Sequence, residues 1–187
     1  MADLILASQS PRRKQLLEWA EVSFDIVVSD ADESFPAGLL PEEVAVFIAR
    51  QKAAAVAAQD QKRIILAADT IVVLGSDIIG KPLDREDAIS ILTRLSGNRH
   101  QVITGVVIRR GDREEVFADT TEVEFHPLTR EQVIYYVDNY RPYDKAGAYA
   151  IQEWIGVTGI RSINGDFYNV MGLPVSRVVQ ALREFSQ

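Results

Sequence analysis

Short runs of Val, Ile and Leu alternate with amphipathic stretches along most of this chain, and this alternation restricts its fold more than any other feature. Apolar runs bounded by turn residues are typical of strands, and nearly continuous runs suit strands that are covered on both faces. The partial alternation in "TEVEF" instead suits a strand with one solvent-exposed face. We predict strands at Leu4–Ala7, Phe24–Ser29, Ile64–Ala67, Ile71–Leu74, Val102–Arg109 and Val116–Phe125.

Helices are predicted where apolar residues follow the spacing i, i+3, i+4, i+7, or where a helix start or an alanine-rich stretch is visible. The predicted helices are Ala88–Leu95, Val133–Tyr140, Val175–Leu182, a long one from Pro41 to about Gln59, and one that begins in "SPRRKQLLEWA". Strands that alternate with helices favour an α/β fold with a mixed sheet. The 187 residues suffice for one substantial core or for two small lobes that share a core.

Charge and composition narrow the class of ligand. The formal net charge is −7, which argues against a protein that binds the nucleic-acid backbone but leaves room for a small anion held by a few placed cations. No stretch approaches the roughly 20 apolar residues of a membrane span, and "MADLILASQS" lacks the features of a secretory signal. The absence of cysteine excludes disulfides and thiolate metal sites. We therefore expect a cytoplasmic protein that binds neither membranes nor nucleic acid.

The segment "LASQSPRRK" places cations where a helix normally disfavours them. Ser10 followed by Pro11 predicts a capped helix start, yet Arg12, Arg13 and Lys14 come next. Each cation in a first turn costs on the order of 0.3–1 kcal/mol, because the helix N-terminus itself carries partial positive charge. A bound polyphosphate would reverse that balance, since the free N–H groups of a strand–loop–helix turn and the arginine donors all favour an anion. The alternative is that these side chains simply point into water.

The segment "LAADTIVVLG" interrupts an apolar stretch with Asp69 and Thr70. A carboxylate among buried strands costs free energy unless it is paired, hydrogen-bonded or bound to a metal. The position therefore suits either a ligand for a hard cation or a general base. The alternative is an ordinary turn capped by an Asp-Thr pair.

The segment "GSDIIGKPLD" matches the first seven positions of a P-loop, but Pro82 stands where that motif needs Ser or Thr. Proline has neither a hydroxyl for magnesium nor an N–H for phosphate, so we reject the P-loop. The pair Ile78-Ile79 instead predicts a short hairpin strand. Lys81 can still bind phosphate as a point charge.

The remaining candidates are weak when each is taken alone. Lys52 on the long helix and Glu33 in "SDADESFP" are ordinary solvated charges by themselves. In "DKAGAYAIQEW", Gly147 allows close backbone approach and Gln152 offers an amide for a base edge, although a simple tight turn explains the stretch as well. The two histidines have no metal-ligand spacing, and we assign them no role.

Taken together, these stretches resemble one family. The segments "LASQSPRR", "AADTIVV", "GKP", "LSGNRHQVITGV", "DKAGAYAIQ" and "NGDFYNVMGLP" have the order and spacing seen in Maf-type nucleoside triphosphate pyrophosphatases. The resemblance runs from Leu4 to the last helix. It implies a single domain over residues 1–187 with the inosine triphosphatase-like (Maf/Ham1) fold. That fold is an elongated mixed β-sheet flanked by helices, with two lobes and a central cleft.

The resemblance also implies an activity and a set of residues. The reaction is hydrolysis of a nucleoside triphosphate between the α and β phosphates, giving the monophosphate and pyrophosphate, with a divalent metal (Mg or Mn) assisting. Matched position by position, the catalytic aspartate falls on Asp69, and the polar and charged pocket residues fall on Ser8, Arg12, Arg13, Glu33, Lys52 and Lys81. The positions linked to substrate choice fall on Arg12, Thr70 and Gln152.

That trio resembles the subgroup that acts on dTTP and UTP, and modified pyrimidine nucleotides stay open as further substrates. One departure is Glu153-Trp154, where many relatives have glycine, and we expect it to alter the lip of the base pocket. Relatives suggest a homodimer.

The resemblance allows a division of roles. We expect Arg12 and Arg13 to hold the triphosphate, and Lys52 and Lys81 to stabilise charge on the leaving pyrophosphate. Asp69 would activate the attacking water as a general base, and Glu33 would help to hold the metal. Which of the two carboxylates binds the metal stays open.

The alternative function is a nucleotide-binding regulator of cell division without significant turnover. The presence of Asp69 together with both lysines favours the enzyme, because binding alone does not require a base.

Overall fold

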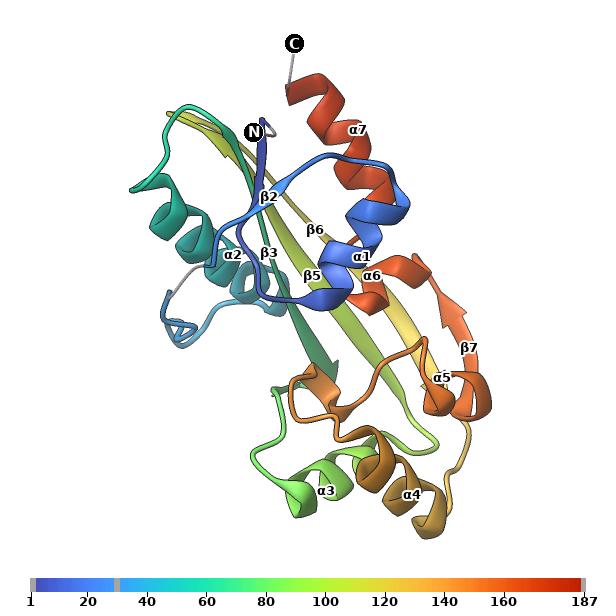
Figure 1. Ribbon diagram of the computed structural model, residues 1–187. Helices are drawn as coiled ribbons and strands as arrows, with labels where there is room; N and C mark the ends of the chain where they lie inside the picture. The colour runs from blue at the N-terminus through green and yellow to red at the C-terminus, as the bar shows by residue number, and fades with distance from the viewer. Residues whose placement is uncertain (1–2, 29–30, 186–187) are drawn as a thin grey trace. The chain divides into compact units, whose positions relative to one another are not determined.

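The computed structural model of the chain describes residues 3–28 and 31–185 (Figure 1). Its helices are α1 (Pro11–Trp19), α2 (Pro41–Ala57), α3 (Arg85–Leu95), α4 (Arg130–Tyr140), the 3-10 helix η1 (Ala146–Ala148), α5 (Trp154–Gly159), α6 (Phe167–Met171) and α7 (Val175–Phe185). Its strands are β1 (Leu4–Leu6), β2 (Asp25–Ile26), β3 (Ile64–Leu74), β4 (Asp77–Ile79), β5 (Arg99–Arg110), β6 (Arg113–Phe125) and β7 (Ile160–Asn164). The predicted α/β class is confirmed.

The strands form a mixed sheet in the order β2-β1-β3-β5-β6-β7, and β4 pairs with β3 outside this path. β1 lies parallel to β2 and to β3, whereas β3–β4 and β6–β7 are antiparallel pairs. The last pair between β1 and β3 joins Leu6 to Leu66, so β3 continues beyond the end of β1. The residues that follow β1 are therefore placed beside the middle of β3, where Asp69 and Thr70 lie.

The chain divides into two compact units. The first contains the residues up to Thr70, residues 104–119 and the residues from Gly172 onward; the second contains residues 71–103 and 120–171. The division falls inside β3, β5 and β6, so each of these long strands contributes to both units.

In the first unit, α2 packs its alanine-rich face against β1, β3 and β5, and Figure 1 shows α1 and α7 on the other side of these strands. Gly105 on β5 marks the closest approach of α2. A Cβ at that position would lie 2.4 Å from the carbonyl carbon of Ala45, so helix and strand meet backbone to backbone. The core cluster on this face comprises Ile5, Ala7, Ala49, Ala53, Val56, Ala57, Ile65, Ala67 and Val107.

In the second unit, α3 packs against α4, and a buried aromatic group surrounds His100. The Nε2 of His100 lies 2.7 Å from the hydroxyl of Tyr149, and both rings contact Phe125. Burial lowers the pKa of His100 to about 4, so the imidazole is neutral at pH 7. His100 is thus a core residue.

The structure differs from the sequence prediction at several boundaries. Residues 64–74 form one continuous strand, so Asp69 and Thr70 do not make a turn and that interpretation was wrong. The predicted strand at Phe24–Ser29 is reduced to β2, and Ser29 lies outside the described residues. The hairpin strand expected at Ile78-Ile79 is confirmed as β4. The short elements β7, α5 and α6 were not predicted, because they are too short for a clear period and α5 carries two glycines.

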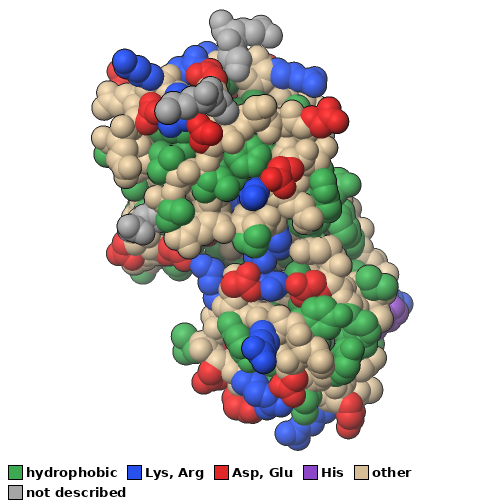
Figure 2. Space-filling view, viewed as in Figure 1, with side chains coloured by type: hydrophobic (Ala, Val, Ile, Leu, Met, Phe, Trp, Pro, Cys, Tyr) green, Lys and Arg blue, Asp and Glu red, His purple; other side chains and the backbone are tan. Residues whose placement is uncertain are grey.

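No helix in the described part of the chain has the length and apolar character needed to cross a membrane. Figure 2 shows acidic and basic side chains interspersed over the face in view.

Candidate active site

The turn after β1 forms a capped helix start, as predicted. The Ser10 hydroxyl accepts a hydrogen bond from the Arg13 N–H at 3.4 Å, and Pro11 occupies the first helical position. The Ser8 hydroxyl accepts from the Ser10 N–H at 3.1 Å, so two serines organise the turn. The first turn of α1 contains no acidic residue. The turn therefore carries only positive charge, which is the unfavourable arrangement noted in the sequence.

Arg13 does not point into water. Its side chain is buried and donates three hydrogen bonds: from Nε to the Gly172 carbonyl at 2.7 Å, from Nη1 to the Ser8 hydroxyl at 3.2 Å, and from Nη2 to the Thr70 hydroxyl at 3.0 Å. Burial lowers the pKa of Arg13, while the charge on Asp69 opposes that shift. A guanidinium stays protonated at neutral pH even so. All three acceptors are neutral, so the protein fixes this cation in place without neutralising it by direct contact.

Asp69 and Thr70 leave opposite faces of β3, because successive side chains of a strand alternate. Asp69 continues the face of Ile65 and Ala67, which packs against α2. Thr70 points to the other face, where its hydroxyl meets Arg13. The dipeptide therefore connects two polar groups, one on each side of the sheet.

On the α2 face, three charged side chains form a cluster. The ammonium of Lys52, from α2, lies 2.6 Å from Asp69 Oδ1 and 2.9 Å from Glu33 Oε1. The side chains of Lys52 and Asp69 are each 13% exposed, whereas Glu33, from the loop before α2, is 50% exposed. Lys52 and Glu33 are thus not the isolated surface charges that each would be alone. The cluster carries two carboxylates on one cation, at the edge of solvent.

On the α1 face, two residues that the sequence analysis did not single out complete the site. The Thr104 hydroxyl lies 2.9 Å from that of Thr70, and the Gly172 carbonyl accepts from both Arg13 and Thr70. Gly172 has φ +117°, a conformation that L side chains rarely adopt, which explains a glycine here. The motif "NGDFYNVMGLP" contains this glycine, so a signal was present, but its contact with Arg13 spans 159 residues of sequence.

The other predicted residues are placed as follows. Arg12 is partly buried on α1 beside Arg13. Lys81 follows β4, and Gln152 lies in the turn before α5; both side chains are exposed and belong to the second unit. The first unit contains the other seven residues, in two groups: Ser8, Arg13 and Thr70 are hydrogen-bonded on one face of β3, Lys52 contacts Glu33 and Asp69 on the other, and Arg12 lies beside Arg13 on α1.

The cluster on the α2 face can be tested for its fit to a divalent metal. Within residues 3–28 and 31–185 no group of three or more His, Asp or Glu side chains converges as a protein-only metal site. Asp69 and Glu33 nevertheless both contact one cation, the Lys52 ammonium. Mg²⁺ is commonly held by one or two carboxylates plus substrate phosphates and water. The donor set therefore fits a metal that is shared with a phosphate ligand.

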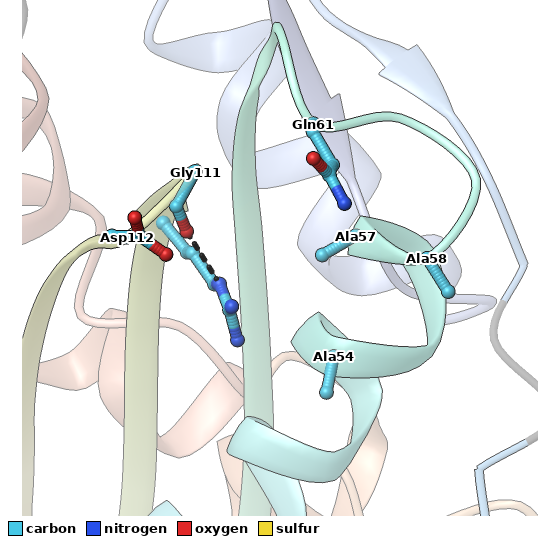
Figure 3. Close-up of a pocket in the computed structure, with 7 residues that line it drawn as sticks. Ala54, Ala57, Ala58, Gln61, Gly111 and Asp112 are labelled. Carbon is cyan, nitrogen blue, oxygen red and sulfur yellow. Dashed lines mark hydrogen bonds between the residues drawn. The ribbon is translucent and has the colours of Figure 1, made fainter.

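A pocket of about 330 Å³ lies elsewhere, at the end of α2 (Figure 3). Its one arginine, Arg109, donates its Nε–H to the Gly111 carbonyl at 3.0 Å, and the carboxylate of Asp112 also lines the pocket. The negative end of the α2 dipole and this carboxylate disfavour a polyphosphate. The lining is completed by Ala54, Ala57, Ala58 and Gln61.

Comparison with known proteins shows the family of the chain. The model of the family described as "Maf-like protein" matches residues 3–185. This chain belongs to the Maf-like family. A dTTP/UTP pyrophosphatase of Cytophaga hutchinsonii is 50% identical over 182 residues, which cover 97% of this chain and 84% of that protein. A dTTP/UTP pyrophosphatase of Bacillus velezensis is 48% identical, with 98% of this chain and 96% of that protein covered.

A solved structure shows the same fold at low sequence identity. The Staphylococcus aureus Ham1 protein aligns with a TM-score of 0.53 and 18% identity, covering 98% of this chain and 99% of that one. The expectation of a Maf/Ham1 fold is therefore confirmed.

Proposed function

We propose that this chain is a nucleoside triphosphate pyrophosphatase that hydrolyses dTTP and UTP between the α and β phosphates. Relatives that are 50% and 48% identical over nearly the whole chain bear the name dTTP/UTP pyrophosphatase. The structural observation that carries the proposal is the pair Asp69–Lys52, held 2.6 Å apart, together with the electrostatic interaction of Asp69 with the buried cation Arg13. That arrangement supplies a base and fixed positive charge at one position of β3.

The α1 turn is proposed to bind the phosphates. Arg13 is held by neutral oxygens, so its charge acts on an incoming anion without first breaking an ion pair with a carboxylate. The Arg12 guanidinium is proposed to add donors on the same helix end. A triphosphate there supplies the negative charge that the first turn of the helix lacks.

Asp69 is proposed as the general base. Lys52 contacts Oδ1, and Oδ2 has no hydrogen-bond partner among the residues that the structure describes. Oδ2 takes a proton from the attacking water, whose oxygen forms a bond to the α-phosphorus. The bond between that phosphorus and the α–β bridging oxygen breaks, and pyrophosphate leaves with the electron pair. Lys52 and Lys81 are proposed to stabilise its charge.

Asp69 and Glu33 are the residues that would hold a divalent metal, Mg²⁺ or Mn²⁺. When bound with substrate, such an ion neutralises charge on the phosphate oxygens. Both carboxylates already contact the Lys52 ammonium, so they can bind the same ion without a large movement of α2.

Substrate choice is proposed to depend on Arg12, Thr70 and Gln152. The Thr70 hydroxyl is occupied by Arg13, Thr104 and the Gly172 carbonyl, so we propose that it acts by fixing Arg13. The proposed roles of Lys81 and Gln152 rest on the family motifs, and Gln152→Ala tests the second of them. We further propose that residues 1–187 act as one catalytic domain in the cytoplasm, as a homodimer. The alternative of a regulator without turnover is not favoured, because binding alone does not require Asp69 to face an open position.

The test is pyrophosphate release from a panel of nucleoside triphosphates with Mg²⁺ or Mn²⁺. We expect turnover of dTTP and UTP, and a decrease in kcat of about 10²–10⁴-fold in Asp69→Asn, the usual contribution of a general base. Asp112→Asn, an exposed aspartate at the pocket in Figure 3, is the matched control and should keep wild-type activity. Nucleotide binding without pyrophosphate release would contradict the proposal and favour the regulator.

A further inference from the structure

The turn that carries Gln152 is held rigidly by its neighbours. Its side chain is exposed and forms no hydrogen bond with another described residue. The residues on either side are fixed: Ala150 and Ile151 are buried, and the Glu153 N–H donates to the Ala150 carbonyl at 3.1 Å. The amide of Gln152 is therefore aimed by the backbone of the turn.

Tyr136, from α4, holds both ends of this turn. Its ring is fully buried and stacks on Tyr140 with ring centroids 4.9 Å apart. The hydroxyl accepts a hydrogen bond from the Ala150 N–H at 3.1 Å and donates one to the Glu153 carboxylate. One phenol oxygen thus joins the first and last residues of the turn.

Glu153 is also tied to Lys145. The Lys145 ammonium is 3.7 Å from Glu153 Oε1 and 2.7 Å from Asp144 Oδ1, and Lys145 is buried. The Glu153 carboxylate thus has two polar contacts, one with the Tyr136 hydroxyl and one with the Lys145 ammonium, and both hold the last residue of the turn.

Helix α5 closes the turn from the other side. A Cβ on Gly156 would lie 1.7 Å from the Ile151 carbonyl oxygen, so the helix backbone packs directly on the turn. The Gly156 N–H also donates to the Glu153 carbonyl at 2.9 Å. The aromatic edge contact of Tyr135 with Trp154, 4.9 Å between centroids, joins α4 to α5.

We propose that Tyr136 and Glu153 are positioning residues that fix the turn 150–153 and so aim Gln152 at the nucleobase. The proposal rests on the proposed function, in which Gln152 contributes to base recognition. A hydrogen bond to a base edge requires placement within a fraction of an ångström, and a free side chain on a loose turn does not give it. Tyr136 and Glu153 act through Gln152 and do not touch the phosphates, so they affect KM and base preference more than kcat.

The test compares KM and kcat for dTTP, UTP and dGTP in Tyr136→Phe, Gln152→Ala and the double variant. We expect Tyr136→Phe to raise KM for dTTP and UTP about three- to tenfold, the worth of one positioned hydrogen bond, and to change kcat less than about twofold. In the Gln152→Ala background the same substitution should have no further effect on KM. Tyr135→Phe is the matched control on the same helix, because it removes a hydroxyl that has no partner among the described residues.

Glu153 supplies a second test should Tyr136→Phe fold poorly. Glu153→Ala should reproduce the increase in KM, whereas Glu153→Gln keeps an oxygen for the Tyr136 hydroxyl and should restore most of the base preference. Equal losses in the wild-type and Gln152→Ala backgrounds, or an unchanged KM in every variant, would overturn the inference while the proposed function stands. Absence of turnover in the wild type would overturn both.

Discussion

Arg13→Lys tests whether the buried guanidinium stabilises the first unit in addition to its proposed role in phosphate binding. The arginine makes three hydrogen bonds that diverge toward Ser8, Thr70 and Gly172, at 3.2, 3.0 and 2.7 Å. A lysine ammonium is a single point on a flexible stem and cannot reach all three acceptors. We expect it to keep one of them.

The magnitude follows from the two bonds that are lost. Hydrogen bonds to a charged group contribute about 1.5 kcal/mol or more each, so the substitution should lower the free energy of unfolding by about 3 kcal/mol. For a chain of this size that corresponds to a decrease in Tm of roughly 6–12 °C. Chemical and thermal denaturation without nucleotide measure both quantities.

Arg50→Lys is the matched control. Arg50 forms an ion pair with Glu114 at 2.8 Å, but its side chain is 54% exposed, so the exchange should change the free energy of unfolding by less than about 0.5 kcal/mol. If Arg13→Lys is as stable as this control, the three contacts do not hold the unit together. The role of Arg13 would then be confined to ligand binding.

Two further predictions concern stability. Burial lowers the pKa of His100 to about 4, below its usual value near 6.5, so the unfolded chain binds a proton more tightly than the folded chain does. The free energy of unfolding should therefore decrease as pH falls from about 6.5 to 4, and by pH 5 the loss is about 2 kcal/mol. Denaturant titrations at pH 7 and pH 5 should show this decrease in the free energy of unfolding for the wild type and a smaller decrease for His100→Phe. An equal decrease in both proteins would contradict the attribution to His100. Gly105→Ala should destabilise the chain by at least about 3 kcal/mol or prevent folding, because its Cβ would lie 2.4 Å from the backbone of α2. Gly80→Ala, which meets no atom within 4 Å, should keep the wild-type melting temperature, and similar melting of both variants would refute the backbone contact.

Much of the fold could be predicted from the sequence because its signals are local. The apolar runs of β3 and β5, the spacing Ala88/Ile91/Leu92/Leu95 in α3, and the Ser10-Pro11 start of α1 each depend on a few consecutive residues. The continuity of β3 through Asp69 and Thr70 was missed, because a polar dipeptide inside an apolar run is typical of a turn. Partners that are distant in sequence stabilise these polar groups in the strand: Lys52 contacts Asp69, and Arg13 contacts Thr70.

The site could likewise be predicted only as far as local sequence signals reach. The cations of α1 and the position of Asp69 followed from residue type, but the contacts among them did not. Glu33 reaches Lys52 from a loop, and Gly172 reaches Arg13 from the far end of the chain. Such pairings depend on how strands and helices pack, and a single sequence carries no periodic signal for them. The network of Tyr136 with Glu153 is of the same kind.

The opposite directions of Asp69 and Thr70 have a consequence for how this site changes by mutation. The two side chains are adjacent in sequence, yet each contacts a different helix, so a substitution at one leaves the partner of the other in place. If the proposed roles hold, single replacements can therefore change anion affinity and proton transfer separately. A one-residue insertion upstream in β3 would shift the register so that the Asp69 carboxylate faces Arg13 and Ala68 faces Lys52. A one-residue deletion would instead place the Thr70 hydroxyl against Lys52 and Ile71 against Arg13. A substitution at either position therefore disturbs one of the two groups, whereas a change in the length of the strand disturbs both.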